Sequence, residues 1–407
     1  MNSNLPCFFQ TLTILAIGAA MIDVSSLRAQ EVSSVIDGRV ESGQVLDVIL
    51  PQAEGRRGGL ELGAVVSAAY SNNIFLSSSK PTADMVFKLG PSIAYTQGDR
   101  KEGEGGYLRG AYQPMGVLYA RGKADNRIDQ TAAIEAGWRG KISKVTFEGM
   151  LQRLGDATAD IGTQTERLES KNEIRGAWMV REKVTLEAAV GAWQTRYQSR
   201  GLVDSGQIYG EVAARYAYSP KTEAGVSYRL GSLKIEGEES QTVQQLTGRM
   251  VWLPREKIEV KIDAGTEFRD YGMGTNISPV VNARVGWKPR AGALLYFSAF
   301  QRQQVSALNQ GQIYESKGLT AGGVQRLGGN WLARIDVGYE IASYLSGGSA
   351  GAASREDKIW FVRPALNYQF SDQLDGSLYY EASDNNSTDP GFGYSAATTG
   401  IEINYKF

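Results

Sequence analysis

The chain has 407 residues, 42% of them hydrophobic, and its 43 basic and 44 acidic residues leave a formal charge of −1. Nucleic acid is not an expected partner, because there is no basic excess to neutralise phosphates. The sequence has no histidine, and its single cysteine is Cys7. These absences exclude histidine triads and histidine metal sites, so no enzyme activity, cofactor or metal is expected.

Residues 1–29 are typical of a cleaved secretory signal peptide. Thr11 to Ile22 form an apolar run that is too short to span a membrane, and it is followed by Ser25-Ser26-Leu27-Arg28-Ala29. We predict cleavage after Ala29, which would leave the mature chain without cysteine. Residues 1–10 carry no Lys or Arg, so an internal strand or helix of a cytoplasmic protein is the alternative interpretation.

Residues 30–59 have patchy hydrophobicity and end in the glycine-rich run 55–59. We expect a periplasmic arm or a segment inside a barrel lumen, and a mobile leader is the alternative.

From residue 60 to residue 407 the chain alternates between apolar and polar residues. The clearest stretch is Lys257–Arg269, where the even positions from Ile258 to Phe268 are apolar except for Thr266, and the odd positions are charged except for Gly265. A strand points successive side chains to opposite faces, so such a segment has one apolar and one ionic face. In chain order the alternating segments are 60–70, 87–95, 107–119, 128–138, 145–151, 168–178, 184–192, 208–216, 224–230, 246–252, 258–268, 281–287, 293–299, 319–327, 331–341, 360–370, 374–382 and 397–407.

These segments predict an all-β fold, a transmembrane antiparallel up-and-down β-barrel of about 18 strands (16–18) over residues 60–407. Pro91 lies inside the second segment, and because proline cannot donate a hydrogen bond we expect a β-bulge there. A soluble all-β repeat protein is the rival fold, and extraction without detergent would favour it.

The connections alternate in length, as in transmembrane barrels with short periplasmic turns and longer extracellular loops. The short set is 180–183, 219–221, 253–256, 288–291, 328–330 and 371–373. The long set is 71–83, 120–127, 154–164, 198–205, 231–240, 304–312, 345–356 and 384–393.

Aromatic residues favour the same orientation. Five of the seven tryptophans flank short turns, which predicts an aromatic girdle at the periplasmic rim: Trp138, Trp178, Trp252, Trp287 and Trp331. The final residues, Ile401 to Phe407, alternate and end on an aromatic, and this pattern resembles the terminal assembly signal of outer-membrane barrels.

Tyr70-Ser71-Asn72-Asn73-Ile74-Phe75, together with the downstream Pro91, resembles an early motif of the beta-barrel porin type 2 family. The resemblance implies an outer-membrane barrel of a Gram-negative bacterium, often associated with exopolysaccharide systems, and it implies no catalytic residues. Asn72 and Asn73 are also common turn formers, so a purely structural role in a loop is an open alternative.

Charged residues occupy the parity that faces the lumen, because Arg or Lys on the lipid face would cost about 2–4 kcal/mol at the bilayer midplane. The predicted pore-lining residues are Arg215, Arg229, Arg249, Lys261, Asp263, Glu267, Arg269, Arg284, Arg302, Arg334, Asp336, Glu340, Arg363 and Glu381. A hydrated pore that filters solutes is one interpretation. A charge network that stiffens the wall of a plugged barrel is the other.

Two carboxylate patterns suggest chemistry but have simpler explanations. Glu259 and Asp263 repeat along one strand with Lys261 between them, which favours a salt-bridged ladder over acid–base catalysis. The run Asp384–Asp389 resembles part of a calcium loop but lacks the full ligand spacing and the final glutamate.

The combined expectation is a porin-like channel for polar solutes, or for export-associated polysaccharide. The alternatives are a structural or adhesion barrel with a blocked lumen and a membrane-embedded hydrolase, which the lack of histidine disfavours. Expected partners are outer-membrane lipids and lipopolysaccharide, the barrel-assembly machinery and exopolysaccharide-export components.

Overall fold

The computed structural model describes residues 58–98, 104–270, 274–308, 313–345 and 355–407. The predicted signal peptide and nearly all of the segment 30–59 lie outside the described residues. Within the described part of the chain, no helix is long and apolar enough to span a membrane.

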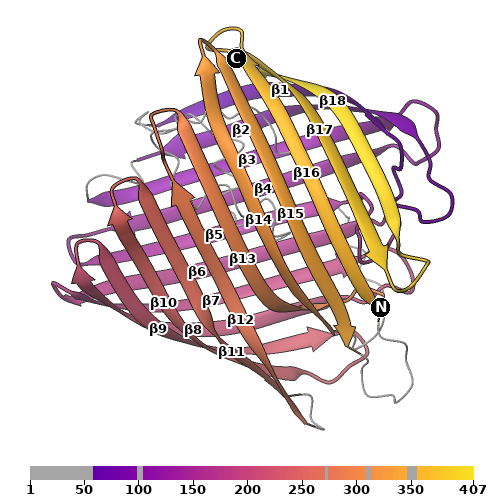
Figure 1. The fold of residues 1–407 in the computed structure, drawn as a ribbon. Helices are drawn as coiled ribbons and strands as arrows, with labels where there is room; N and C mark the ends of the chain where they lie inside the picture. The colour runs from indigo at the N-terminus through magenta and orange to yellow at the C-terminus, as the bar shows by residue number, and fades with distance from the viewer. Residues whose placement is uncertain (1–57, 99–103, 271–273, 309–312, 346–354) are drawn as a thin grey trace, which may run out of the picture.

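Eighteen antiparallel strands form one closed barrel, which confirms the predicted fold class and strand count. Each strand pairs with its neighbours in sequence, and β1 pairs with both β2 and β18, so the sheet closes on itself (Figure 1). The strands are β1 Gly59–Ser71, β2 Asp84–Gln97, β3 Gly105–Tyr119, β4 Arg127–Arg139, β5 Ser143–Leu154, β6 Arg167–Arg181, β7 Val184–Tyr197, β8 Ser205–Ser219, β9 Thr222–Ile235, β10 Gln241–Arg255, β11 Ile258–Asp270, β12 Thr275–Trp287, β13 Ala293–Val305, β14 Ile313–Gly328, β15 Trp331–Leu345, β16 Glu356–Gln369, β17 Leu374–Ser387 and β18 Tyr394–Lys406.

The two ends of the barrel differ as the loop lengths predicted. One end, here called the short-turn end, carries tight turns such as those between β6 and β7 and between β8 and β9. The other end, the long-loop end, carries longer connections, including residues 72–83 and 155–166. The connection between β11 and β12 is an exception, because it is short and lies at the long-loop end.

Several strands extend further toward the long-loop end than the alternation predicted. The predicted loop 231–240 begins only after Ile235, and the predicted loop 384–393 begins only after Ser387. The prediction ended these strands too early because it followed apolar side chains, whereas backbone pairing continues through polar residues such as Asn385.

The bulge predicted at Pro91 is absent. The register of β2 against β3 is the same on both sides of Pro91, from Leu89 opposite Gly116 to Ile93 opposite Tyr112, with an unpaired gap between. Pro91 and Pro114 both lie in this gap, where neither needs to donate a hydrogen bond. The backbones approach closely there, because a Cβ added to Gly90 would collide with the carbonyl oxygen of Pro114.

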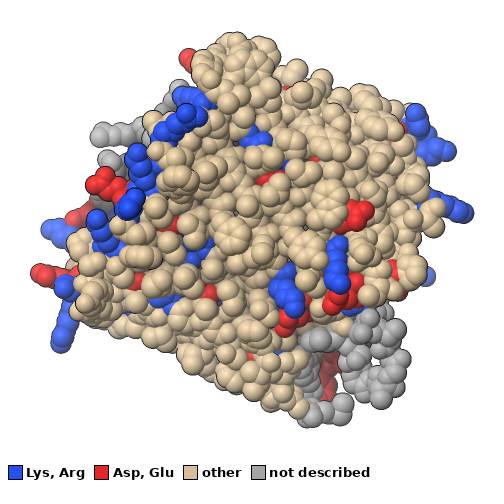
Figure 2. Space-filling view, in the orientation of Figure 1, with Lys and Arg blue, Asp and Glu red and all other residues tan. Residues whose placement is uncertain are grey.

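The barrel exposes apolar side chains and buries charged ones. Large apolar residues on the outer face are exposed, among them Leu60, Val190 and Ile208. In β11 Phe268 is exposed, while Glu267 and Arg269 on either side of it are buried. Figure 2 shows one side of this surface, which is mainly uncharged, with most of the Lys, Arg, Asp and Glu side chains toward its ends. The outer face therefore suits a lipid environment, and the inner face suits water.

Candidate functional site in the lumen

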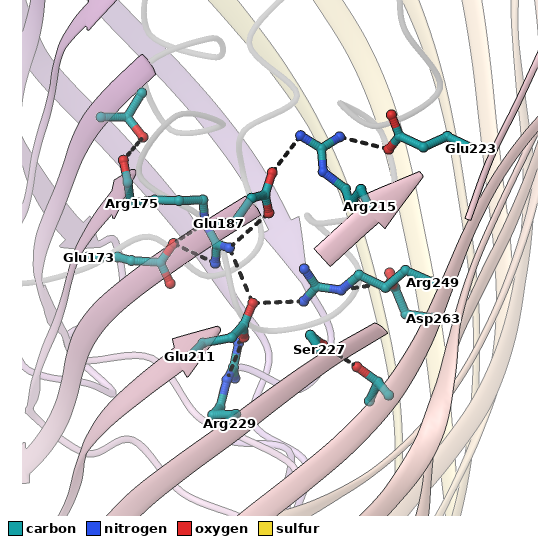
Figure 3. A network of polar contacts seen from close by, with 12 residues as sticks. Glu173, Arg175, Glu187, Glu211, Arg215, Glu223, Ser227, Arg229, Arg249 and Asp263 are labelled. Carbon is teal, nitrogen blue, oxygen red and sulfur yellow. Dashed lines mark hydrogen bonds and ion pairs between the residues drawn. The ribbon is translucent and has the colours of Figure 1, made fainter. Parts of the chain in front are cut away.

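Among the residues that the structure describes, the largest group of interacting charges lines the inner wall over six consecutive strands, β6 to β11. Figure 3 shows these side chains converging on Glu211, which is only 4% exposed. The members of this cluster, here called the Glu211 network, are Glu173, Arg175, Glu187, Glu211, Arg215, Glu223, Arg229, Arg249 and Asp263.

Glu211 binds three guanidinium groups at once. Its Oε1 accepts from Arg175 Nη1 at 3.2 Å and from Arg249 Nη2 at 3.0 Å. Its Oε2 accepts from Arg229 Nη2 at 2.6 Å. Charge-assisted bonds of this kind are stronger than neutral ones, so Glu211 fixes the inward rotamers of three arginines from β6, β9 and β10.

The network extends on both sides of Glu211 and nearly balances its own charge. Arg215 Nη1 lies 2.7 Å from Glu223 Oε1, and Arg249 Nε lies 3.2 Å from Asp263 Oδ1. The cluster sets five carboxylates against four guanidinium groups. It presents both signs of charge to the lumen and no large excess of either.

Most of the predicted pore-lining residues belong either to this network or to a set of local pairs. Arg215, Arg229, Arg249 and Asp263 belong to the network. The remaining pairs join residues on one strand or on adjacent strands: Lys261 with Glu259, Arg269 with Glu267, Arg334 with Asp336, and Arg363 with Glu381.

Three further predicted residues contact polar or aromatic groups on the same inner wall. The guanidinium carbon of Arg284 lies 5.7 Å from the ring centre of Tyr296, and that of Arg302 lies 5.0 Å from the ring centre of Phe300. Glu340 accepts a hydrogen bond from the hydroxyl of Ser316. These contacts are also neighbour-to-neighbour contacts and do not cross the lumen.

A connection that the sequence did not single out crosses the barrel at its long-loop end. Residues 155–166 leave the wall at β5 and return at β6, and the tip residue Asp160 reaches the end of β15, half of the eighteen-strand ring away. Asp160 Oδ1 accepts from Tyr344 Oη at 2.9 Å and from Ser306 Oγ at 3.1 Å, and its Oδ2 accepts from the Ala307 N–H at 2.8 Å. We call this contact the Asp160 latch.

Arg355, which lies on the same side of the barrel as Tyr344, also holds the tip of the loop 155–166. Its guanidinium donates to the carbonyl oxygens of Ala159 at 2.9 Å and Asp160 at 3.1 Å. The same group pairs with Asp357 and stacks on Phe392, 3.6 Å from the ring centre. Because its contacts with Asp357 and Phe392 hold the Arg355 guanidinium in place, this group is a fixed donor for the carbonyl oxygens of the loop.

The base of the loop is tied to its own side of the barrel. Asp156 pairs with Arg167 at 3.1 Å, and Gln164 Nε2 donates to Tyr119 Oη at 2.6 Å. A second connection also crosses, since the Val203 N–H donates to the Ala307 carbonyl oxygen at 2.8 Å. The mouth at the long-loop end is therefore spanned by chain that is fastened on both sides.

Burial raises the pKa of the Asp160 carboxyl above its usual range, although the bonds from Ala307, Tyr344 and Ser306 and the charge of Arg355 act in the opposite direction. The carboxyl therefore holds a proton more readily in the latch than it would in water. No feature of the sequence around Asp160 indicates this, because its partners lie far along the chain.

The predicted aromatic girdle lies at one level of the barrel. Trp138, Trp178, Trp252, Trp287 and Trp331 are all exposed at the short-turn ends of their strands. Phe407 is exposed beside Tyr405, with ring centres 5.0 Å apart. Their roles at a membrane interface and in assembly stay predictions.

The asparagines of the Tyr70–Phe75 motif connect the first loop to β18. The Asn72 carboxamide oxygen accepts from the Ala397 N–H at 2.7 Å, and the Asn73 side-chain nitrogen donates to the Ser395 carbonyl oxygen at 3.2 Å. Asn73 is buried. These bonds support the structural interpretation of the motif, since they fasten the point where the barrel closes.

The calcium-like run also forms a turn. Asp389 Oδ1 accepts from the Gly391 N–H at 2.9 Å, and Asn385 donates to the Phe392 carbonyl oxygen at 2.9 Å. Over the described ranges, no group of three or more His, Cys, Asp or Glu side chains is arranged to hold a metal ion.

No protein-family model and no curated protein matches the chain. Its fold is similar to that of the outer membrane protein OpdK from Pseudomonas aeruginosa, with 11% identity and a TM-score of 0.45, over 86% of this chain and 99% of that one. It is similar to OccK7 (OpdD) from the same organism, with 12% identity and a TM-score of 0.47, over 86% and 98%. The fold is also similar to that of OccAB3 from Acinetobacter baumannii, with 11% identity and a TM-score of 0.46, over 86% of this chain and 99% of that one. The resemblance to the beta-barrel porin type 2 family stays a prediction.

Proposed function

We propose that this chain is a channel of the Gram-negative outer membrane through which small polar solutes pass passively. The observation that carries the proposal is the arrangement of the barrel wall, which has apolar side chains outside and charged side chains inside. The outer face exposes residues such as Ile208 and Val190, while the inner face places the Glu211 network in the lumen. A closed barrel satisfies its backbone internally, so it can stand in lipid, and an ionic lumen requires water.

The network supports passage without strong selection by charge sign. A solute that moves along β6 to β11 meets guanidinium and carboxylate groups in alternation. These groups already neutralise one another, as in the pair of Arg215 with Glu223. A wall of this kind offers hydrogen bonds to polar solutes and binds none of them deeply enough to stop release.

The loop 155–166 sets the size limit in this proposal. It crosses the mouth at the long-loop end and is fastened at Asp160 on one side and at Gln164 on the other. A solute must pass beside the loop or wait until the latch opens. The Asp160 latch is therefore the point at which conductance can be changed without altering the wall.

Single-channel recording in planar bilayers tests the proposal. We expect stepwise currents from the intact protein and larger steps from a variant in which residues 157–164 are replaced by a short Gly-Ser linker. A second variant that lacks residues 30–59 measures whether that segment contributes to the block. Silence from all three proteins, each shown to be folded by its resistance to unfolding in detergent, would overturn the channel.

The second candidate function is a structural or adhesion barrel with a closed mouth, and the Asp160 latch is the observation that favours it. The two candidates give different results in the same recordings. A closed barrel is silent when intact and conducts only after the loop is replaced, whereas a channel conducts in both forms.

An exopolysaccharide role rests on the resemblance of residues 70–75 alone. We infer that, if it applies, exopolysaccharide-export components co-purify with the intact protein. We also propose lipopolysaccharide and the barrel-assembly machinery as partners. Both follow from the proposed location in the outer membrane. Loss of membrane insertion on deletion of Phe407 would support its role as the assembly signal.

A further inference from the structure

Five consecutive short turns repeat one arrangement of two residue types. Each follows an even-numbered strand from β4 to β12, carries a lysine, and comes after an outward aromatic near the end of that strand. The lysines of the five turns are Lys141, Lys183, Lys221, Lys257 and Lys288. The aromatics are Trp138, Trp178, Tyr218, Trp252 and Trp287, all of them exposed.

Four of the lysines, Lys141, Lys183, Lys221 and Lys257, are exposed. Lys288, the fifth, is half-buried. Lys257 Nζ also donates to the Pro289 carbonyl oxygen, 3.3 Å away in the next turn, so these two adjacent turns are in contact. We call the five turns the lysine arc. It runs along half of the barrel rim.

The arc carries a positive excess. Arg181, Arg255 and Arg290 add exposed positive charge, while Glu182 and Glu256 are the acidic residues of these turns. In Figure 2, Lys and Arg side chains line the upper-left edge, where Figure 1 places the short turns.

The positive excess does not continue on the other side of the rim. The connection after β2 carries Arg100 and Lys101, but it also carries Asp99, Glu102 and Glu104 and so has no positive excess. The turn after β14 is Gly329-Asn330, and the turn after β16 contains Asp372 and no lysine. The charge therefore belongs to one arc and does not simply follow from the tightness of the turns. Positive charge that is confined to one side of the rim indicates a surface that binds a partner.

The aromatic rings narrow the choice of partner. An exposed indole at the edge of an apolar belt marks the depth at which acyl chains give way to headgroups. Each lysine lies just beyond such a ring, at the level of lipid phosphates. Basic residues at this depth attract anionic lipids, and the attraction fades within a Debye length. An acidic protein or peptidoglycan would need the lysines but not the aromatic beside each one.

We propose that the lysine arc binds the headgroups of anionic phospholipids in the leaflet that faces the short turns. The headgroups bridge neighbouring turns, so one half of the rim carries a bound lipid row and the other half does not. This inference depends on the barrel standing in a membrane. It does not depend on conduction through the lumen.

Quenching of tryptophan fluorescence by brominated lipids tests the proposal. The full-length protein is reconstituted into phosphatidylethanolamine vesicles that contain phosphatidylglycerol, with the bromine on one lipid or the other at equal mole fraction. We expect brominated phosphatidylglycerol to quench several-fold more strongly. The difference should disappear in about 0.5 M salt, where screening shortens the range of the charges.

Two matched variants separate the arc from general surface charge. The variant with K141Q, K183Q, K221Q and K257Q should lose the preference for phosphatidylglycerol. The variant with K80Q, K123Q, K234Q and K358Q changes four exposed lysines toward the long-loop end and should keep it. Both should migrate as folded barrels before unfolding in heated detergent.

Equal quenching by both brominated lipids, or an unchanged preference in the arc variant, would overturn the proposal. Co-sedimentation with purified peptidoglycan is the competing readout. Loss of that sedimentation in the arc variant, with lipid quenching unchanged, would assign the arc to the cell wall instead. Conductance serves as an independent control, because a silent barrel that still selects phosphatidylglycerol leaves this inference intact.

Discussion

The Glu211 network and the Asp160 latch both use a carboxylate with three hydrogen-bond donors, buried at Glu211 and half-buried at Asp160, yet they connect different parts of the molecule. Glu211 joins strands that are close in the sheet, from β6 to β10. Asp160 joins opposite walls of the barrel through a loop. The first contact stiffens the wall, and the second determines whether the mouth is crossed. The same local chemistry therefore serves wall stability in one place and access to the lumen in the other.

The donors differ as well, and this difference predicts different responses. Glu211 is surrounded by guanidinium groups, so its charge is compensated. Asp160 receives two hydroxyls and one backbone N–H, with Arg355 bound to the backbone carbonyls beside it. A neutral donor set compensates charge less completely, so the latch should respond to pH more than the wall does.

The largest expected effect is on stability, from the substitution Glu211→Gln. It leaves three inward arginines without their shared carboxylate, and breaking a buried ion pair costs about 3 kcal/mol. Urea unfolding of the barrel in lipid vesicles measures the loss. The control is Glu381→Gln, which loses one partner, Arg363 at 2.8 Å, and should cost about 1 kcal/mol. Equal losses in the two variants would show that Glu211 is no centre of the network.

The substitution Asp160→Ala should cost less stability and change conductance more. It removes the acceptor of the buried Ser306, Ala307 and Tyr344 donors, which costs about 2 kcal/mol for the latched loop. We expect larger current steps, and faster protease cleavage within residues 155–166, while the urea midpoint of the wall hardly moves. Unchanged currents together with unchanged cleavage would show that the loop stays in place without the latch.

A smaller effect is expected from pH alone. Burial raises the pKa of Asp160, so the latched state binds a proton more tightly than the released state does. Lowering the pH through that pKa therefore favours the latched loop, and raising the pH favours its release. Open probability should fall as the pH is lowered from neutral toward about 4, where Tyr344 and Arg355 do not titrate. In Asp160→Ala this component should vanish, and an identical pH profile in both proteins would refute it.

The smallest expected effect is the coupling free energy between the Glu211 network and the Asp160 latch. If the wall and the latch are independent, the double variant Glu211→Gln with Asp160→Ala should lose the sum of the two single losses, within about 0.5 kcal/mol. A larger deviation in the urea measurements would mean that the network and the loop form one cooperative unit.

Much of the fold could be predicted from the sequence, and some of the candidate site could as well. The inward parity of Arg215, Arg229, Arg249 and Asp263 follows from the two-residue period of a strand, and the structure places all four in one network. The predicted bulge at Pro91 was wrong, because proline also fits a ladder gap of unchanged register. Glu211 was only one inward acid among many in the sequence, and nothing in its neighbourhood indicates that it is the centre.

By itself the sequence predicted the strand count to within two, and it determined the two faces of each strand and the difference between the two barrel ends. Those features depend on side-chain alternation and turn composition, which are local properties. Only the tertiary structure decided which charges meet and what crosses the mouth. Arg249 reaches Glu211 because the strand register through β9 brings β10 and β8 to that level, and Asp160 reaches Tyr344 because closure of the barrel places β15 opposite β5. Register and closure are collective properties of all eighteen strands, and no single stretch of sequence encodes them.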